Sequence, residues 1–307
     1  MWVLTDEGEQ LEITEEEFKA LGLSLKLTPP VGALNLYKSS AFRRLPLDIG
    51  PQILGDGILP RACKLVVYGK EKTRKSFLSM QLCKCVGRGE TFLGIDTTQG
   101  RSVYIQSELS AAAVQQRMKA DWGDGFVANA YSLKLDERQG AKDFLDSVAE
   151  VNPDLVVIDP LYKVLTGDLN DASAVQVVLD VLDEAIEETG TSIVLVHHEN
   201  REGKVQGSGR ILQWPDGVLH MRKKTPESPK HRLVFEAMRH CVKTPKDIHL
   251  VFNDETCEFD VSDEKTLKER VFEWLDSGGE PEELEREFPE ENGITLRGYR
   301  KNWRDSQ

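Results

Sequence analysis

Apolar runs alternate with helical patterns along the central part of the chain. Four short runs rich in Val, Ile and Leu predict buried strands, at residues 64–68, 101–106, 154–159 and 192–197. Helical patterns separate them, near 75–87, at 110–120, and from the capping Asp171 to the terminating Gly190. Strands that alternate with helices in this way predict an α/β fold whose mostly parallel, twisted sheet is flanked by helices on both faces.

The pattern changes again towards both ends of the chain. After about residue 214, alternating positions predict antiparallel strands at 216–222, 232–239, 248–252 and 256–261. From Ser262 onward, helical spacing predicts three short helices, the last two at 280–288 and 296–303. Near the start, a capping box predicts a short helix between Thr14 and Gly22. We therefore expect an N-terminal accessory segment at 1–55, an α/β core at 56–261, and a small helix-turn-helix-like unit at 262–307.

The strongest chemical signal lies between the first predicted strand and its helix. Residues 69–76 read GKEKTRKS, which matches the phosphate-loop spacing GxxxxGK[ST] except at Arg74, where glycine is usual. Backbone N–H groups can wrap a phosphate there, Lys75 can reach the terminal phosphates, and the Ser76 hydroxyl can hold Mg²⁺. A basic turn that binds no nucleotide is the alternative. The residues expected to contact ATP are Gly69, Lys70, Glu71, Lys72, Thr73, Arg74, Lys75, Ser76 and Phe77.

Polar side chains also follow the other predicted parallel strands. Asp159 ends an apolar strand in the Walker B arrangement and is expected to hold Mg²⁺. Glu108 follows the strand at 101–106, where a carboxylate can deprotonate the water that attacks a γ-phosphate. The alternative for Glu108 is an acidic residue that stabilises a helix start. His198 ends the fourth run and can hydrogen-bond a γ-phosphate, whereas a structural histidine is the alternative.

Composition narrows the class of protein. The formal net charge of −13 over 307 residues disfavours a protein that coats nucleic acid with one basic face, although local basic clusters leave DNA binding open. Five cysteines without a CxxC motif favour reduced thiols over disulfides or zinc sites. The sequence has no apolar run of membrane-spanning length and no signal-peptide pattern at its start, so we expect a cytoplasmic protein with no membrane partner.

The last predicted helix allows two interpretations. Arg297, Arg300, Lys301 and Arg304 recur at helical spacing with aromatic residues between them, which suits a recognition helix that contacts DNA phosphates. The preceding segment, 280–288, is strongly acidic and would repel DNA. The alternative is therefore a basic helix that pairs with its acidic neighbour.

Several segments together resemble a RecA-superfamily ATPase and, within that superfamily, the RepA-like branch of hexameric replicative helicases. The resemblance covers about residues 55–255. It rests on the segments KLVVYGKEKTRKSFL, VYIQSELS, DLVVIDPLYKVLTGDLND, IVLVHHENREG and GSGRILQWPDGVLHMR. It implies a RecA-like fold, ATP and Mg²⁺ as ligands, single-stranded or duplex DNA as a partner, and a homo-oligomeric ring, with six subunits expected.

The resemblance also implies roles for individual residues. Lys75 and Ser76 would bind the triphosphate and Mg²⁺. Asp159 and Glu108 would coordinate metal and activate water, and His198 would sense the γ-phosphate. A basic residue of the neighbouring subunit completes each site in this family. Its place in FEAMRHCVKTP makes Arg239 the candidate for this finger, with an exposed strand-end arginine as the alternative.

The function expected from the resemblance is that of an ATP-hydrolysing, DNA-acting motor, a RepA-like helicase of a plasmid, phage or integrated element. One rival is a recombination mediator or single-strand DNA-binding ATPase of the RadA-like or phage annealing kind. The other is a nucleotide-gated regulator whose phosphate loop binds ATP but hydrolyses it slowly because of Arg74.

Overall fold

The computed structural model describes residues 2–4, 10–12, 39, 43, 52–200, 202–223, 225, 227–262, 267–289 and 293–304. The chain divides into two compact units, Met1–Ile49 and Gly50–Gln307. In the first unit, β1 (Trp2–Leu4) pairs antiparallel with β2 (Gln10–Glu12). The helix predicted between Thr14 and Gly22 lies outside the described residues. The boundaries predicted at 55/56 and 261/262 stay a prediction.

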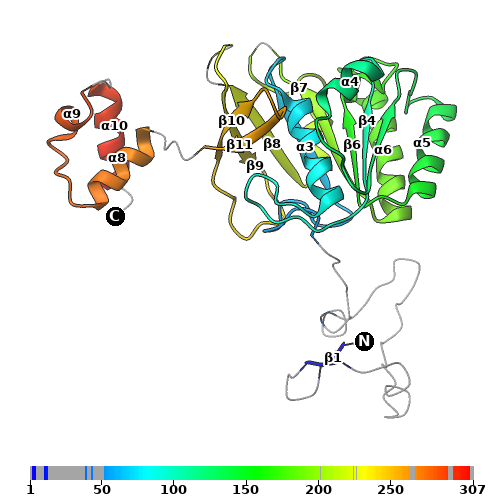
Figure 1. Cartoon of the computed structure of the whole chain (residues 1–307), viewed down its shortest axis with the longest axis horizontal. Helices are drawn as coiled ribbons and strands as arrows, with labels where there is room; N and C mark the ends of the chain where they lie inside the picture. Colours follow the sequence, from blue (N-terminus) through cyan, green and yellow to red (C-terminus); the bar gives the residue numbers. More distant parts are fainter. Residues whose placement is uncertain are drawn as a thin grey trace. The chain divides into compact units, whose positions relative to one another are not determined.

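The second unit contains a nine-stranded mixed sheet with the strand order β11-β10-β9-β8-β3-β7-β6-β4-β5 (Figure 1). Six neighbouring strands run parallel: β3 (Lys64–Gly69), β4 (Ser102–Gln106), β5 (Gly125–Asn129), β6 (Leu155–Asp159), β7 (Ser192–His198) and β8 (Gly217–Lys223). The remaining strands continue antiparallel from β8: β9 (Lys230–Glu236), β10 (Ile248–Asn253) and β11 (Glu258–Val261). The predicted fold class, a parallel α/β core with antiparallel strands on its C-terminal side, is confirmed.

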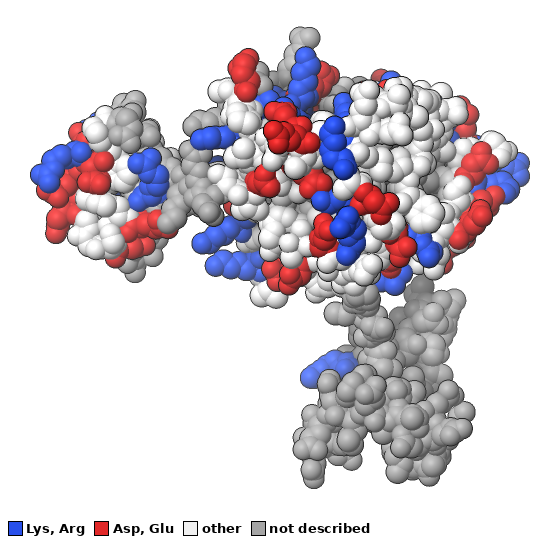
Figure 2. Space-filling model, viewed as in Figure 1, with Lys and Arg blue, Asp and Glu red and all other residues white. Residues whose placement is uncertain are grey.

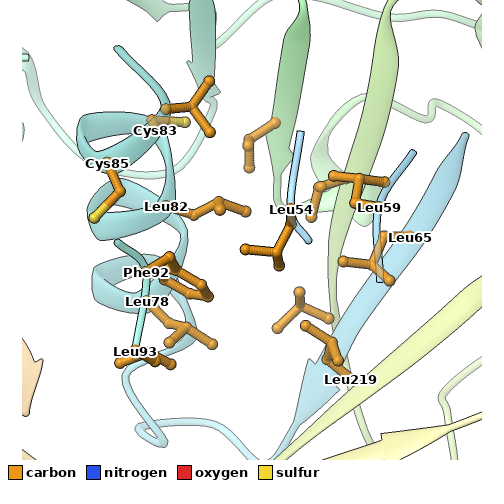
Figure 3. Packing of buried hydrophobic residues seen from close by; sticks show 14 of the residues in the cluster. Leu54, Leu59, Leu65, Leu78, Leu82, Cys83, Cys85, Phe92, Leu93 and Leu219 are labelled. Carbon is orange, nitrogen blue, oxygen red and sulfur yellow. The ribbon is translucent and has the colours of Figure 1, made fainter. Parts of the chain in front are cut away.

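Helices cover both faces of this sheet. The helices of the parallel part are α3 (Lys75–Arg88), α4 (Ala111–Arg117), α5 (Arg138–Val151) and α6 (Ala172–Thr189). Side chains alternate along β3, so that Leu65 and Val67 pack on the face covered by α3 and α4, and Val66 packs on the face covered by α5 and α6. Figure 3 shows the first of these layers, where leucines of α3 meet the sheet. Two buried layers therefore hold the strand ends that carry the site.

The observed elements differ from the predicted ones in four places. Strand β5 and helix α5 were not predicted, and the four-residue helix α7 (Arg210–Gln213) was also missed. The predicted helix at 110–120 ends at Arg117, since Met118 adopts an extended backbone. The strand predicted at 232–239 ends at Glu236, because the next residue turns into the left-handed region with φ 50°.

The carboxyl-terminal helices form a small unit of their own. They are α8 (Leu267–Asp276), α9 (Leu284–Glu287) and α10 (Gly293–Arg304). The helix predicted at 280–288 is thus only four residues long, while the other two are confirmed. The buried side chains of this unit are Val271, Leu275, Leu284, Phe288 and Leu296. No helix in the described part of the chain combines the length and the apolar character of a membrane span.

The basic residues of α10 pair with acidic residues of the same unit. Arg297 lies 3.5 Å from Glu285, and Arg300 and Arg304 lie 3.2 and 3.1 Å from Glu282. Figure 2 shows the two signs of charge interspersed over this unit. The contacts favour the pairing alternative for these three arginines over a free phosphate-binding face. The aromatic residues of α10 that pack against the apolar core are Tyr299 and Trp303.

Candidate active site

The phosphate loop leaves the end of β3 and enters α3 at Lys75. A side chain at Gly69 would bring its Cβ to 2.3 Å from the carbonyl oxygen of Met221, so the close approach of β8 requires glycine there. Lys72 and Arg74 both have left-handed backbones, with φ of 61° and 63°. The conformation at residue 74 explains why this loop usually carries glycine at that position.

The side chain of Arg74 is held away from the loop by the β10–β11 hairpin. Its Cζ lies 3.7 Å from the centre of the Phe252 ring, a cation–π contact. Its Nη2 lies 3.0 Å from Oδ1 of Asp254, in the turn after β10. The replacement of glycine therefore leaves the loop backbone in its usual shape and adds a tether to the antiparallel part of the sheet.

Lys75 begins α3 and is almost fully buried, with 5% of its surface exposed. Its Nζ donates hydrogen bonds of 2.8 Å to the carbonyl oxygens of Gly69 and Lys70 and lies 3.5 Å from Nδ1 of His198. Burial lowers the pKa of Lys75 to about 8, although nearby carboxylates, first among them Asp159, oppose this shift. The loop thus holds a buried ammonium group at the point where a phosphate would be bound.

Asp159 ends β6 and faces the start of α3. Its carboxylate is buried, and Oδ2 accepts a 2.6 Å hydrogen bond from the hydroxyl of Tyr104 on β4. Burial raises the pKa of Asp159, while hydrogen bonds from Tyr104 and Ser76 work in the opposite direction. A carboxylate beside a hydroxyl is a set of hard oxygen donors, and a divalent cation would offset the cost of the buried charge. These residues therefore fit Mg²⁺.

Glu108 lies two residues beyond β4, whose last residue pairs in parallel register with Asp159. The hydroxyl of Tyr162 donates a hydrogen bond to Oε1 of Glu108. Burial, followed by the effect of Glu108, raises the pKa of Tyr162, so the phenol stays protonated. The Tyr162 ring lies 5.6 Å from that of His198. Tyr162 was not assigned a role from the sequence, although it lies in the segment DPLYK that carries the resemblance.

The two histidines that end β7 face opposite sides of the sheet, as successive strand residues do. His198 faces the phosphate loop, and burial, followed by the charge of Lys75, lowers its pKa. His197 is fully buried, and its Nε2 lies 2.7 Å from the carbonyl oxygen of Gln206. His198 can therefore contact a bound phosphate, whereas His197 has the structural role.

A cavity of about 830 Å³ joins these groups at the carboxyl edge of the parallel strands. This is the edge at which α/β folds bind ligands. Arg117, missed by the sequence analysis, also lines the cavity, with its Cζ 4.7 Å from the centre of the Phe77 ring. The predicted site residues that the cavity brings together are Glu71, Lys72, Arg74, Lys75, Ser76, Phe77, Glu108, Asp159 and His198.

Arg239 does not belong to this cavity. It follows β9, its Nη1 lies 3.7 Å from Oδ1 of Asp216, and its Nη2 donates to the carbonyl oxygen of Gln213. Asp216 precedes β8, whose first residue pairs with Leu65 near the start of β3. Arg239 therefore lies at the amino edge of the parallel strands, opposite the phosphate loop, and can complete only the site of another subunit.

The fold and the cavity define a RecA-like P-loop ATPase. A family model described as an AAA domain matches residues 50–204, half of the chain, and the chain belongs to this family. The matched region begins just before β3 and extends past the end of β7. It therefore includes the phosphate loop, Glu108, Asp159 and His198.

Two curated relatives are similar over part of their length. They are the DNA repair protein RadA of Mycobacterium tuberculosis strains CDC 1551/Oshkosh and ATCC 25618/H37Rv, each 24% identical over 202 residues. The match covers 63% of this chain and 39% of each relative, so the chain spans about two fifths of the length of these proteins.

Two solved structures share the fold. The KaiC-like protein PH0186 of Pyrococcus horikoshii OT3 superposes with a TM-score of 0.51 at 15% identity, over 70% of this chain and 98% of that one. The second, described as the ATPase domain of a larger protein, superposes with a TM-score of 0.52 at 10% identity, over 65% of this chain and 85% of that one. Likeness at this level of identity establishes a common fold and nothing finer.

Proposed function

We propose that the protein is an ATP-hydrolysing, DNA-acting motor that works as a homo-oligomeric ring, a helicase of the RepA-like kind. The observation that carries this proposal is the cavity, which places a buried ammonium group, a buried carboxylate, an exposed carboxylate and a histidine around one phosphate loop. Phosphoryl transfer to water requires little more than such positioned charges and an activating base.

Each group has a defined task in this proposal. The loop amides and Lys75 bind the triphosphate, and Ser76 and Asp159 hold Mg²⁺, which neutralises phosphate charge when bound. Glu108 takes a proton from the attacking water. The phenol of Tyr162 stays protonated and holds the Glu108 carboxylate in place until water occupies the site.

The segment after His198 is the proposed link from ATP to DNA. Gln206 lines the cavity, and its backbone N–H donates a 3.0 Å hydrogen bond to the carbonyl oxygen of His198. A change in the contact between Lys75 and His198, 3.5 Å apart, would therefore reach this glycine-containing segment directly. The likeness to a protein named for DNA repair supports DNA as the partner.

The same likeness supports a second candidate, a recombination mediator or annealing ATPase of the RadA-like kind. Both candidates are expected to be DNA-stimulated ATPases. A strand-displacement assay separates them, because only the helicase unwinds a forked duplex during ATP hydrolysis.

The third candidate, a nucleotide-gated regulator with slow turnover, rests on the tether formed by Arg74. It predicts ATP binding without an effect of DNA on the rate.

The decisive experiment measures ATP hydrolysis by the full chain with and without single-stranded DNA, under single and multiple turnover. We expect DNA to raise the multiple-turnover rate, and Lys75→Ala to abolish ATP binding with the fold intact. The matched control is Lys142→Ala, on the exposed surface of α5. A rate that DNA leaves unchanged overturns the motor proposal and favours the regulator, whereas undiminished ATP affinity of Lys75→Ala in calorimetry overturns the site itself.

A further inference from the structure

Three side chains with metal-binding chemistry meet at the amino edge of the sheet, away from the phosphate loop. Cys63 immediately precedes β3, Asp216 immediately precedes β8, and His240 lies in the turn after β9. One ligand atom from each side chain lies within 4.8 Å of the other two. The three residues are far apart in the sequence, and the topology of the sheet brings them together.

The separations match those of a tetrahedral metal site. Nε2 of His240 lies 3.5 Å from Sγ of Cys63 and 3.7 Å from Oδ1 of Asp216. Zinc bonds of about 2.0–2.3 Å at the tetrahedral angle place neighbouring ligand atoms about 3.3–3.8 Å apart. The distance between Nε2 and Oδ1 is too long for a hydrogen bond. A single nitrogen thus faces a sulfur and an oxygen at once, as a metal ligand does.

Surrounding contacts hold the ligands in this arrangement. The backbone N–H of Lys64 donates a 3.1 Å hydrogen bond to Oδ2 of Asp216, which leaves Oδ1 directed at the imidazole. A Cβ at Gly57 would lie 2.4 Å from the carbonyl oxygen of His240, so this turn packs tightly against the loop before β3. Such outer contacts orient ligands in metal sites.

We propose that Cys63, Asp216 and His240 bind one divalent ion of the zinc class, with water as the fourth ligand. Sulfur and imidazole ligands select zinc over magnesium or calcium. Binding forms the metal–sulfur bond as the Cys63 thiol releases its proton to solvent, and thiolate and carboxylate then balance the two positive charges. His240 is exposed, which leaves one side open for the ion and its water. Arg239 also contacts Asp216, through Oδ1, and is itself half-exposed, so its guanidinium has room to move aside.

Cobalt(II) is the probe for this site, because its bond to thiolate gives a charge-transfer absorption in the near ultraviolet. The full chain, freed of metal with a chelator, is titrated with cobalt and the bound ion is then displaced by zinc. We expect one cobalt per chain, with the absorption abolished in Cys63→Ser. In His240→Ala, the affinity should fall by more than about 100-fold, because even outer partners of a metal site contribute up to that much.

Cys257→Ser, which removes a thiol in the turn before β11, is the matched control and should bind as the unsubstituted chain does. Circular dichroism checks that each variant is folded, and His240→Ala, at an exposed position, serves as the test if Cys63→Ser does not fold. Absence of the absorption in the unsubstituted chain overturns the proposal. So does an absorption that survives in folded Cys63→Ser, or a cobalt affinity that is unchanged in His240→Ala. None of these outcomes depends on ATP hydrolysis.

Discussion

At the scale of single residues, the ammonium group of Lys75 sets how nucleotide binding depends on pH. Its pKa in the folded chain is about 8, below the ordinary 10.5, so the group is charged below pH 8 and loses its charge above it. Bound phosphate favours the charged form. We therefore expect the dissociation constant for ATP to rise about fivefold between pH 8 and pH 9, by the loss of the protonated fraction.

Calorimetry across this range measures the effect, and Lys75→Arg is its control, because a guanidinium keeps its charge throughout. An affinity that falls equally in Lys75→Arg would assign the pH dependence to another group.

Glu108 provides the second prediction at this scale. Glu108→Gln keeps the shape of the side chain and removes the base, so ATP should still bind while hydrolysis slows by about 10²-fold or more. Single-turnover rates of hydrolysis measure this, with Glu150→Gln on the exposed surface of α5 as the matched control. Hydrolysis at the original rate in Glu108→Gln would leave Glu108 as an ordinary acidic residue near a helix start.

Sequence reasoning identified these residues because each follows a strand directly, and parallel strands bring their carboxyl ends to one edge. It could not identify Tyr104 and Tyr162 as partners of the two carboxylates. Their hydrogen bonds join residues more than 50 positions apart, and depend on register rather than on any local spacing. The ligand set of Cys63, Asp216 and His240 was hidden for the same reason, since the sequence contains no CxxC motif.

At the scale of secondary-structure elements, Arg74 links the phosphate loop to the β10–β11 hairpin. Arg74→Ala and Arg74→Gly both remove the contacts with Phe252 and Asp254, but only glycine relieves the left-handed backbone, which costs other residues about 1 kcal/mol. We therefore expect Arg74→Gly to unfold in urea with a free energy about 1 kcal/mol higher than that of Arg74→Ala. Equal values would show that the loop relaxes to another conformation in the variants.

Elements with a complete buried pattern were predicted, and those with a partial pattern were missed. Strand β5 lies at the sheet edge and leaves Phe126 and Val127 exposed, so its sequence lacks the continuous apolar run of a central strand. Helix α5 buries only Phe144 and Val148 and has no side-chain cap at its start. Helix α9 is short because its acidic side chains repel one another along the predicted helix and Pro281 lies near its start.

At the scale of the whole molecule, the positions of the site and of Arg239 bear on assembly. The phosphate loop lies at the carboxyl edge of the parallel strands and Arg239 at the amino edge. A ring in which the first edge of one subunit faces the second edge of the next would supply every ATP with a foreign arginine. Fingers of this kind raise hydrolysis by about 10³–10⁵-fold in related chemistry. Arg239→Ala should therefore retain ATP binding and lose turnover.

Mixing two inactive variants tests whether Arg239 acts between subunits. A Lys75→Ala subunit keeps its arginine, and an Arg239→Ala subunit keeps its phosphate loop, so a mixed oligomer contains complete sites wherever the intact loop faces the intact arginine. We expect mixing to restore part of the ATP hydrolysis that each variant lacks alone. Mass measurement confirms that the variants assemble together, and Lys142→Ala mixed with Lys75→Ala gives the dilution control. If co-assembled variants recover no hydrolysis, Arg239 does not act in trans, and Lys243 or Arg222 becomes the next candidate for the neighbouring cation.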